Sequence, residues 1–142
     1  MLPDGIGGGQ GAAVIGYVAA ALGGALGALA RWGVAEALPR EPGGWPWATL
    51  LVNLLGCFVL GLLIGRVFDR SPGPPWLRPF LATGVLGGFT TYSAFAVETV
   101  QLAEAGRAGI VAGYVLASVA GGVLAAALGQ QAGRAPARER AS

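Results

Sequence analysis

Long apolar runs separated by short polar stretches make up most of the chain. Four runs approach or exceed the roughly 20 mostly apolar residues that a helix needs to cross a bilayer. They predict helices at about residues 12–37, 46–68, 78–103 and 107–131. The stretch DRSPGPPWLRP between the second and third runs predicts a loop, because proline lacks a backbone donor and clashes with the preceding turn. The pattern predicts an all-α integral membrane domain.

Polar tails flank the predicted membrane domain. Residues 1–11 carry an Asp and no Lys or Arg, so we expect a short tail and no cleavable signal peptide. Residues 132–142 are polar and predict an unstructured C-terminal tail. Four spans place both termini on one side, where the loops and tail hold six arginines against two or three on the other. The positive-inside rule then favours cytoplasmic termini.

Composition supports the membrane class and excludes several chemistries. Of the 142 residues, 54% are hydrophobic and only 11% are charged, whereas soluble domains have about 25% charged residues. The chain contains no His and one Cys, which excludes an internal disulfide, a Cys/His zinc site and histidine acid–base chemistry. No cluster of basic residues could follow a phosphate backbone. We therefore expect neither an enzyme nor a nucleic-acid-binding protein.

Small residues recur four positions apart in three of the runs. This spacing lets helix backbones approach closely in a membrane, so we expect packing faces there. The pairs are Gly23 with Gly27, Gly61 with Gly65, and Ala117 with Gly121. Four short helices enclose little interior, so any pathway lined by protein is expected to form between subunits of an oligomer.

Polar side chains inside the runs need a structural or functional reason, because burying them in hydrocarbon is costly. Thr49 and Asn53 share one helix face, and Tyr114 and Ser118 share another. Glu98 is an acid well inside the third run. An Asn in mid-span is more often a hydrogen-bonding contact between helices than an ion ligand, and a Ser can bond back to its own helix, so spacing alone leaves both interpretations open.

The stretch GGFTTYSAF at 87–95 interrupts the third run. Its glycines and hydroxyls weaken a helix, and backbone freed at membrane depth must line a cavity or be buried in protein. We expect a broken helix whose carbonyls could face a cation; the alternative is a continuous helix with a glycine-rich packing face. Beyond the break, Tyr92 and Phe95 project from one face, and their electropositive ring edges could approach an anion.

Together with Thr83-Gly84 before it and Glu98 after it, GGFTTYSAF resembles the signature of the Fluc fluoride channels, also called the CrcB family. The run GALGALARW, which ends at Trp32, is similar to the first helix of that family, and ATLLVNLLG at 48–56 is similar to its second helix. The resemblance extends over about residues 12–131. It implies that this chain is a small four-helix protein that forms an antiparallel, dual-topology homodimer with two fluoride pores.

The resemblance also implies a third helix broken at its centre and a sodium ion at the dimer interface. By position, the backbone carbonyls of Gly87 and Thr90 would bind sodium. The fluoride pore would be lined by Asn53, Tyr92, Phe95, Ser93, Thr91, Tyr114, Ser118 and Thr49, with Arg31 and Glu98 as further candidates. The chain departs from the family pattern at Tyr92, where a Phe is expected, and at Ala48, where a Gly is expected. The unequal arginine count also departs from the balanced loops that dual topology requires.

The resemblance leads us to expect a channel in the cell membrane that exports fluoride passively and reduces its toxicity in the cytoplasm. Fluoride is small and strongly hydrated, so amide, hydroxyl and ring-edge donors would have to replace its water shell. The alternative is a small multidrug-type, proton-coupled transporter of four helices. Such a carrier needs an acid deep in its first helix, where the only candidate is Glu36, near the end. A purely structural membrane subunit would give Asn53 and the break no purpose.

Overall fold

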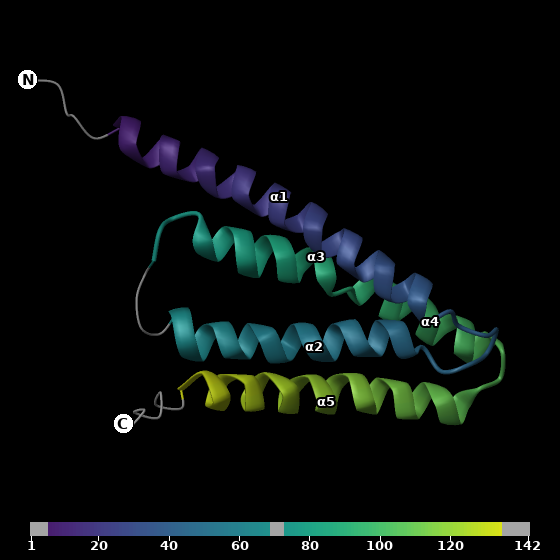
Figure 1. Cartoon of the computed structure of the whole chain (residues 1–142). Helices are drawn as coiled ribbons and strands as arrows, with labels where there is room; N and C mark the ends of the chain where they lie inside the picture. The colour runs from purple at the N-terminus through teal and green to yellow at the C-terminus, as the bar shows by residue number, and fades with distance from the viewer. Residues whose placement is uncertain (1–5, 69–72, 135–142) are drawn as a thin grey trace, which may run out of the picture.

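A computed structural model describes residues 6–68 and 73–134, which form helices and their connections. The second span is α2 continued by the π-helical η1, and the third span consists of π-helical η2 followed by α3 and α4. The elements are α1 (Ile6–Ala37), α2 (Trp47–Leu63), η1 (Ile64–Phe68), η2 (Pro79–Leu86), α3 (Gly87–Phe89), α4 (Tyr92–Glu104) and α5 (Ala108–Arg134). In Figure 1, α1 begins and α5 ends at the same end of the bundle.

Four helices are long and apolar enough to cross a membrane: Gln10–Ala37, Trp47–Phe68, Pro79–Glu104 and Ala108–Arg134. Helix α1 extends back to Ile6 and includes part of the predicted N-terminal tail, because glycine weakens a helix without blocking its hydrogen bonds.

Helix α5 likewise extends to Arg134, into the predicted C-terminal tail, and a basic residue in a last turn is favourable. Residues 1–5, 135–142 and the loop positions 69–72 lie outside the described residues. Apolar periodicity carries no signal for the two π-helical segments, η1 and η2, and they were not predicted.

The helices form two closely packed pairs. Helix α1 lies along η2 and α3, and α2 lies along α5 (Figure 1). A Cβ atom on Gly27 would overlap the carbonyl of Val85, and one on Gly61 would overlap that of Ala126. The predicted small-residue faces of the first and second spans are therefore confirmed as places where backbones touch. Gly121 faces the side chain of Leu54, 3.0 Å from where a Cβ would stand.

The buried core is small and lies toward the end of the bundle that carries the α1–α2 loop. It consists of Leu50, Leu102 and Tyr114, with Trp45 and Phe95 packed against it. Even in the second span only 33% of the apolar window is buried, and in α5 the share is 6%. Apolar surface of this extent must be covered by lipid or by another chain.

Candidate functional site

The third span is broken between α3 and α4. Helix α3 ends at Phe89, and the next two residues are extended, with φ −82° and ψ 157° at Thr90 and φ −148° and ψ 118° at Thr91. Helix α4 then begins at Tyr92. The predicted break is confirmed, and the alternative of a continuous helix is wrong.

The break separates the carbonyl groups of residues 87–90 from their helical donors, and for two of them the structure shows where the former donor goes. In a continuous helix, the Thr91 N–H would donate to the Gly87 carbonyl and the Ala94 N–H to the Thr90 carbonyl. Instead, the Thr91 N–H donates to Asn53 Oδ1 at 2.8 Å, and the Ala94 N–H donates to Thr91 Oγ1 at 3.1 Å. Gly87 and Thr90 thus lose their helical donors. Their carbonyls are the two that the family resemblance implied for a cation site.

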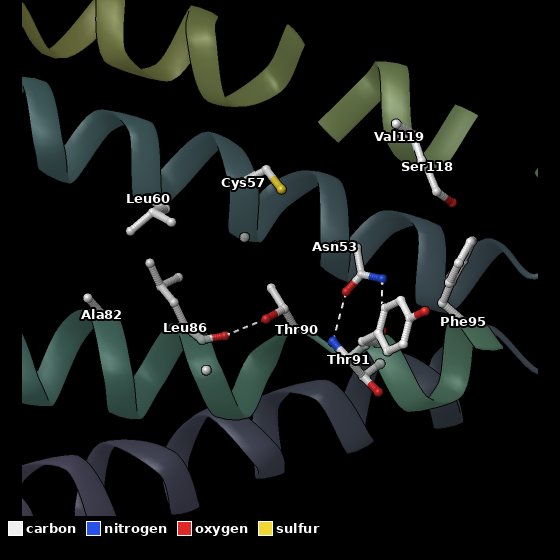
Figure 2. Close-up of a pocket in the computed structure, with 13 residues that line it drawn as sticks. Asn53, Cys57, Leu60, Ala82, Leu86, Thr90, Thr91, Phe95, Ser118 and Val119 are labelled. Carbon is white, nitrogen blue, oxygen red and sulfur yellow. Dashed lines mark hydrogen bonds between the residues drawn. The ribbon is translucent and has the colours of Figure 1, made fainter. Parts of the chain in front are cut away.

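Side chains from other helices hold the break in place. Asn53 of α2 both accepts from the Thr91 N–H and donates through Nδ2 to the Thr91 carbonyl at 3.0 Å (Figure 2). Arg31 of α1 donates through Nε to the Gly88 carbonyl at 3.1 Å. The Thr90 hydroxyl donates to the Leu86 carbonyl at 2.9 Å. Asn53 therefore connects the α2–α5 pair to the broken span, and one of its two amide N–H groups remains for another acceptor.

A cavity of about 440 Å³ lies between the break, α2 and α5 (Figure 2). Seven of the predicted site residues line this pore cavity: Asn53, Gly87, Thr90, Thr91, Tyr92, Phe95 and Ser118. The Ser118 hydroxyl is buried and has no hydrogen-bond partner among the described residues. Sequence reasoning missed the apolar part of the lining, which is Gly56, Cys57, Leu60, Ala82, Leu86 and Val119. Those residues look like ordinary helix-packing positions in the sequence.

Two aromatic rings stand at one side of the pore cavity. The ring centroids of Tyr92 and Phe95 are 5.9 Å apart, as expected for residues on one helix face. Phe95 also contacts the ring of Tyr114 at 5.2 Å. Tyr92 is 80% exposed, so this side of the pore cavity is open in a single copy. Ser93 is also exposed, and its hydroxyl shares a hydrogen bond with Thr91 Oγ1 at 3.1 Å, outside the cavity lining.

A second polar group, which we call the Glu98 cluster, lies apart from the pore cavity. Thr49 Oγ1 donates to Glu98 Oε1 at 2.8 Å, and the Tyr114 hydroxyl donates to Glu98 Oε2 at 2.7 Å. Arg40 Nη1 lies 3.8 Å from Glu98 Oε1. Thr49 and Tyr114 were expected along the fluoride path, but the structure directs both hydroxyls to the carboxylate of Glu98.

Comparison with known proteins identifies the family. Residues 18–130 match the family model described as CrcB-like protein, Camphor Resistance (CrcB). The chain belongs to this CrcB-like family. It is 47% identical over 118 residues to the fluoride-specific ion channel FluC of Paracoccus denitrificans, an alignment that covers 83% of this chain and 94% of that one.

Two further relatives of this CrcB-like chain carry similar names. It is 44% identical over 103 residues to fluoride-specific ion channel FluC 1 of Mycolicibacterium paratuberculosis, covering 72% of this chain and 78% of that one. It is 42% identical over 113 residues to FluC of Bordetella avium, covering 80% and 88%. Together with the four apolar spans, the relationship makes this CrcB-like chain a multi-pass membrane protein.

The geometry determines what this CrcB-like site can do chemically. Among the described residues, no group of three or more His, Cys, Asp or Glu side chains could hold a metal ion. The pore cavity instead presents an amide, hydroxyls and ring edges, and the break presents backbone carbonyls. Sequence reasoning counted Arg40 only as a loop charge, because no spacing in the chain connects a residue of the α1–α2 loop to Glu98.

Proposed function

We propose that this CrcB-like protein is a fluoride-selective ion channel that exports fluoride passively across the cell membrane and so reduces its toxicity in the cytoplasm. The observation that carries the proposal is the lining of the pore cavity. It combines the Asn53 amide and the Ser118 hydroxyl with the rings of Tyr92 and Phe95, and none of the described residues that line it is charged. The names of the three relatives point to the same ion.

Neutral donors suit the passage of a small, strongly hydrated anion. They can replace part of its water shell, and because they carry no full positive charge they do not hold the ion too tightly for release. Asn53 retains one amide N–H after binding Thr91, and the buried Ser118 hydroxyl has no protein partner among the described residues. We assign these two groups to fluoride, together with the ring edges of Tyr92 and Phe95.

The proposed active form is an antiparallel, dual-topology homodimer. Tyr92 is 80% exposed at the edge of the pore cavity, and apolar surface on all four spans is exposed as well. A second copy placed against this side would enclose the path, because one copy alone leaves it open. The family resemblance supports the antiparallel arrangement and two pores per dimer.

The proposed dimer would hold a structural sodium ion on the backbone carbonyls of Gly87 and Thr90. Both residues line the pore cavity, and both carbonyls lose their helical donors at the break. Carbonyl oxygens are ligands that suit a hard alkali cation. A bound sodium ion would supply positive charge at the broken helices and a contact between subunits.

Fluoride efflux from liposomes tests the channel directly. The purified protein is reconstituted, and fluoride and chloride release are followed with ion-selective electrodes at matched gradients. We expect fast fluoride release and negligible chloride release. Chloride release at a comparable rate, or the absence of fluoride release, would contradict the proposal. Uptake of a lipophilic cation driven by a proton gradient would favour the small multidrug-type transporter instead.

Separate measurements test the assembly and the cation. Labelling a single cysteine in the N-terminal tail of a C57S variant from each side of sealed vesicles should reach about half of the copies from either side. Labelling from one side only would contradict dual topology. Replacing all sodium with N-methylglucamine during purification should weaken the dimer in a subunit-exchange assay, and an unchanged exchange rate would argue against bound sodium.

A further inference from the structure

The Glu98 cluster poses an electrostatic problem for an anion path. Glu98 is held by hydroxyls from two different helices, Thr49 of α2 and Tyr114 of α5. Its side chain is 19% exposed, so water screens its charge only in part. A lone carboxylate in this position would repel an approaching anion.

Two hollows meet at Glu98. The loop hollow, of about 680 Å³, is lined by Arg40, Glu98 and Gln101 among others. The inner hollow, of about 270 Å³, is lined by Arg40 and Glu98 again, and by Arg31, Thr49 and Thr91. Arg40 and Glu98 therefore lie on the boundary between the two hollows.

The inner hollow leads on toward the pore cavity. Thr91 lines both the inner hollow and the pore cavity. An ion that enters at the α1–α2 loop and travels to Asn53 would therefore pass the boundary formed by Arg40 and Glu98 before it reaches Thr91. The charge at that boundary decides whether an anion can cross it.

Arg40 is placed to neutralise the carboxylate. Its Nη1 atom lies 3.8 Å from Glu98 Oε1, and its Nη2 atom donates to Gln101 Oε1 at 3.2 Å. The side chain is 21% exposed. Two partners on α4, about one helical turn apart, fix the direction of the planar guanidinium, whereas a lysine ammonium could not reach both from one fixed position.

We propose that Arg40 is a positioning residue of the permeation path: it neutralises Glu98 at the boundary between the loop hollow and the inner hollow, so that fluoride can pass. The inference rests on the proposed channel function. It assigns a role to Arg40, which lies in the α1–α2 loop, outside the four predicted spans and outside the signature at the break. With Arg40 and Glu98 paired, Arg31 leaves the inner hollow with a net positive charge that attracts an anion.

A double-mutant cycle tests the assignment. Fluoride efflux from liposomes is measured for the wild type, R40Q, E98Q and R40Q/E98Q. We expect R40Q to slow efflux about tenfold, within the range of coupling found for charged residues in contact. In the E98Q background, R40Q should have no further effect, because no carboxylate is left to neutralise. An equal loss in both backgrounds, an unchanged R40Q rate, or complete block by E98Q alone would overturn the proposal.

Two further variants separate charge from position and from general surface effects. R40K keeps the charge but loses the fixed contact with Gln101, so its efflux should fall between those of the wild type and R40Q. R107Q removes a positive charge at the same end of the bundle; Arg107 packs against Gly43 of the loop hollow but does not itself line either hollow. Its efflux should equal that of the wild type. A loss as large as that of R40Q would instead assign the effect to overall loop charge.

The Tm in detergent, measured for the same four proteins of the cycle, separates this inference from the channel function. The effects of R40Q and E98Q on Tm should be non-additive, whatever ion the protein carries; we call this the Tm coupling. If the wild type passes no fluoride but the Tm coupling is present, the channel function fails and the positioning of Glu98 by Arg40 stands. If the wild type passes fluoride and the Tm coupling is absent, the positioning role fails.

Discussion

Replacing Asn53 with Ala should destabilise the helix break. We call the two hydrogen bonds between Asn53 and the backbone of Thr91 the Asn53 clamp. The variant loses the hydrogen bonds of 2.8 Å and 3.0 Å that satisfy the N–H and the carbonyl of Thr91. In soluble proteins, an unsatisfied buried backbone group costs about 1–3 kcal/mol. Only the Thr91 N–H would lose its sole partner, because the Thr91 carbonyl, as the N-cap of α4, also accepts the first hydrogen bond of that helix. Hydrogen bonds between membrane helices average about 0.6 kcal/mol each, which gives about 1 kcal/mol. We expect the free energy of unfolding to fall by about 1–3 kcal/mol.

Unfolding by SDS in mixed micelles measures this loss, and hydrogen exchange at the Thr91 amide locates it. The matched control is C57A, one turn further along α2 in the lining of the same cavity. Cys57 makes no side-chain hydrogen bond within residues 6–68 and 73–134. The control should therefore keep slow exchange at Thr91. If N53A is as stable as C57A and exchanges no faster at Thr91, Asn53 acts on the ion alone and the clamp has no energetic role.

Four other substitutions test the packing and the path. G27A places a methyl group against the Val85 carbonyl and should cost about 1–3 kcal/mol of stability. The control G33A has open space beside it and should be neutral or gain up to about 1 kcal/mol. Unfolding by SDS compares the two variants. S118A should leave stability within about 0.5 kcal/mol but slow fluoride efflux, because the hydroxyl has no partner to lose among the described residues. Y92F should preserve or raise efflux, and loss of efflux would place the Tyr92 hydroxyl in the path.

The sequence was informative wherever local pattern and chemistry coincide. Hydrophobic runs located the four spans to within a few residues, apart from the early start of α1 at Ile6. The glycines and hydroxyls of 87–95 predicted the break, because few continuous membrane helices would use them. Small-residue spacing predicted the close approach at Gly27 and Gly61, since only a missing side chain lets backbones touch there.

Sequence reasoning could not assign the polar residues to the right partners. Thr49 and Asn53 share a face of α2, yet Thr49 binds Glu98 and Asn53 binds Thr91. The position of α4 after the break decides whether Thr49 or Asn53 points toward the pore cavity. That position is a tertiary property. Arg40 was missed for the same reason, because its contact with Glu98 depends on the course of the α1–α2 loop.

The break is organised within a single chain, and this constrains how an ion can act on it. Asn53 bonds both the N–H and the carbonyl of Thr91, the Thr91 hydroxyl caps α4, and Arg31 donates to the Gly88 carbonyl. Part of the cost of opening the helix is therefore offset before any ion or second copy arrives. A cation at the break need not open the helix, because the carbonyls of Gly87 and Thr90 are already released. Removing sodium should accordingly speed subunit exchange and leave hydrogen exchange at Thr91 slow. Only a variant at Asn53 should speed both subunit exchange and hydrogen exchange at Thr91.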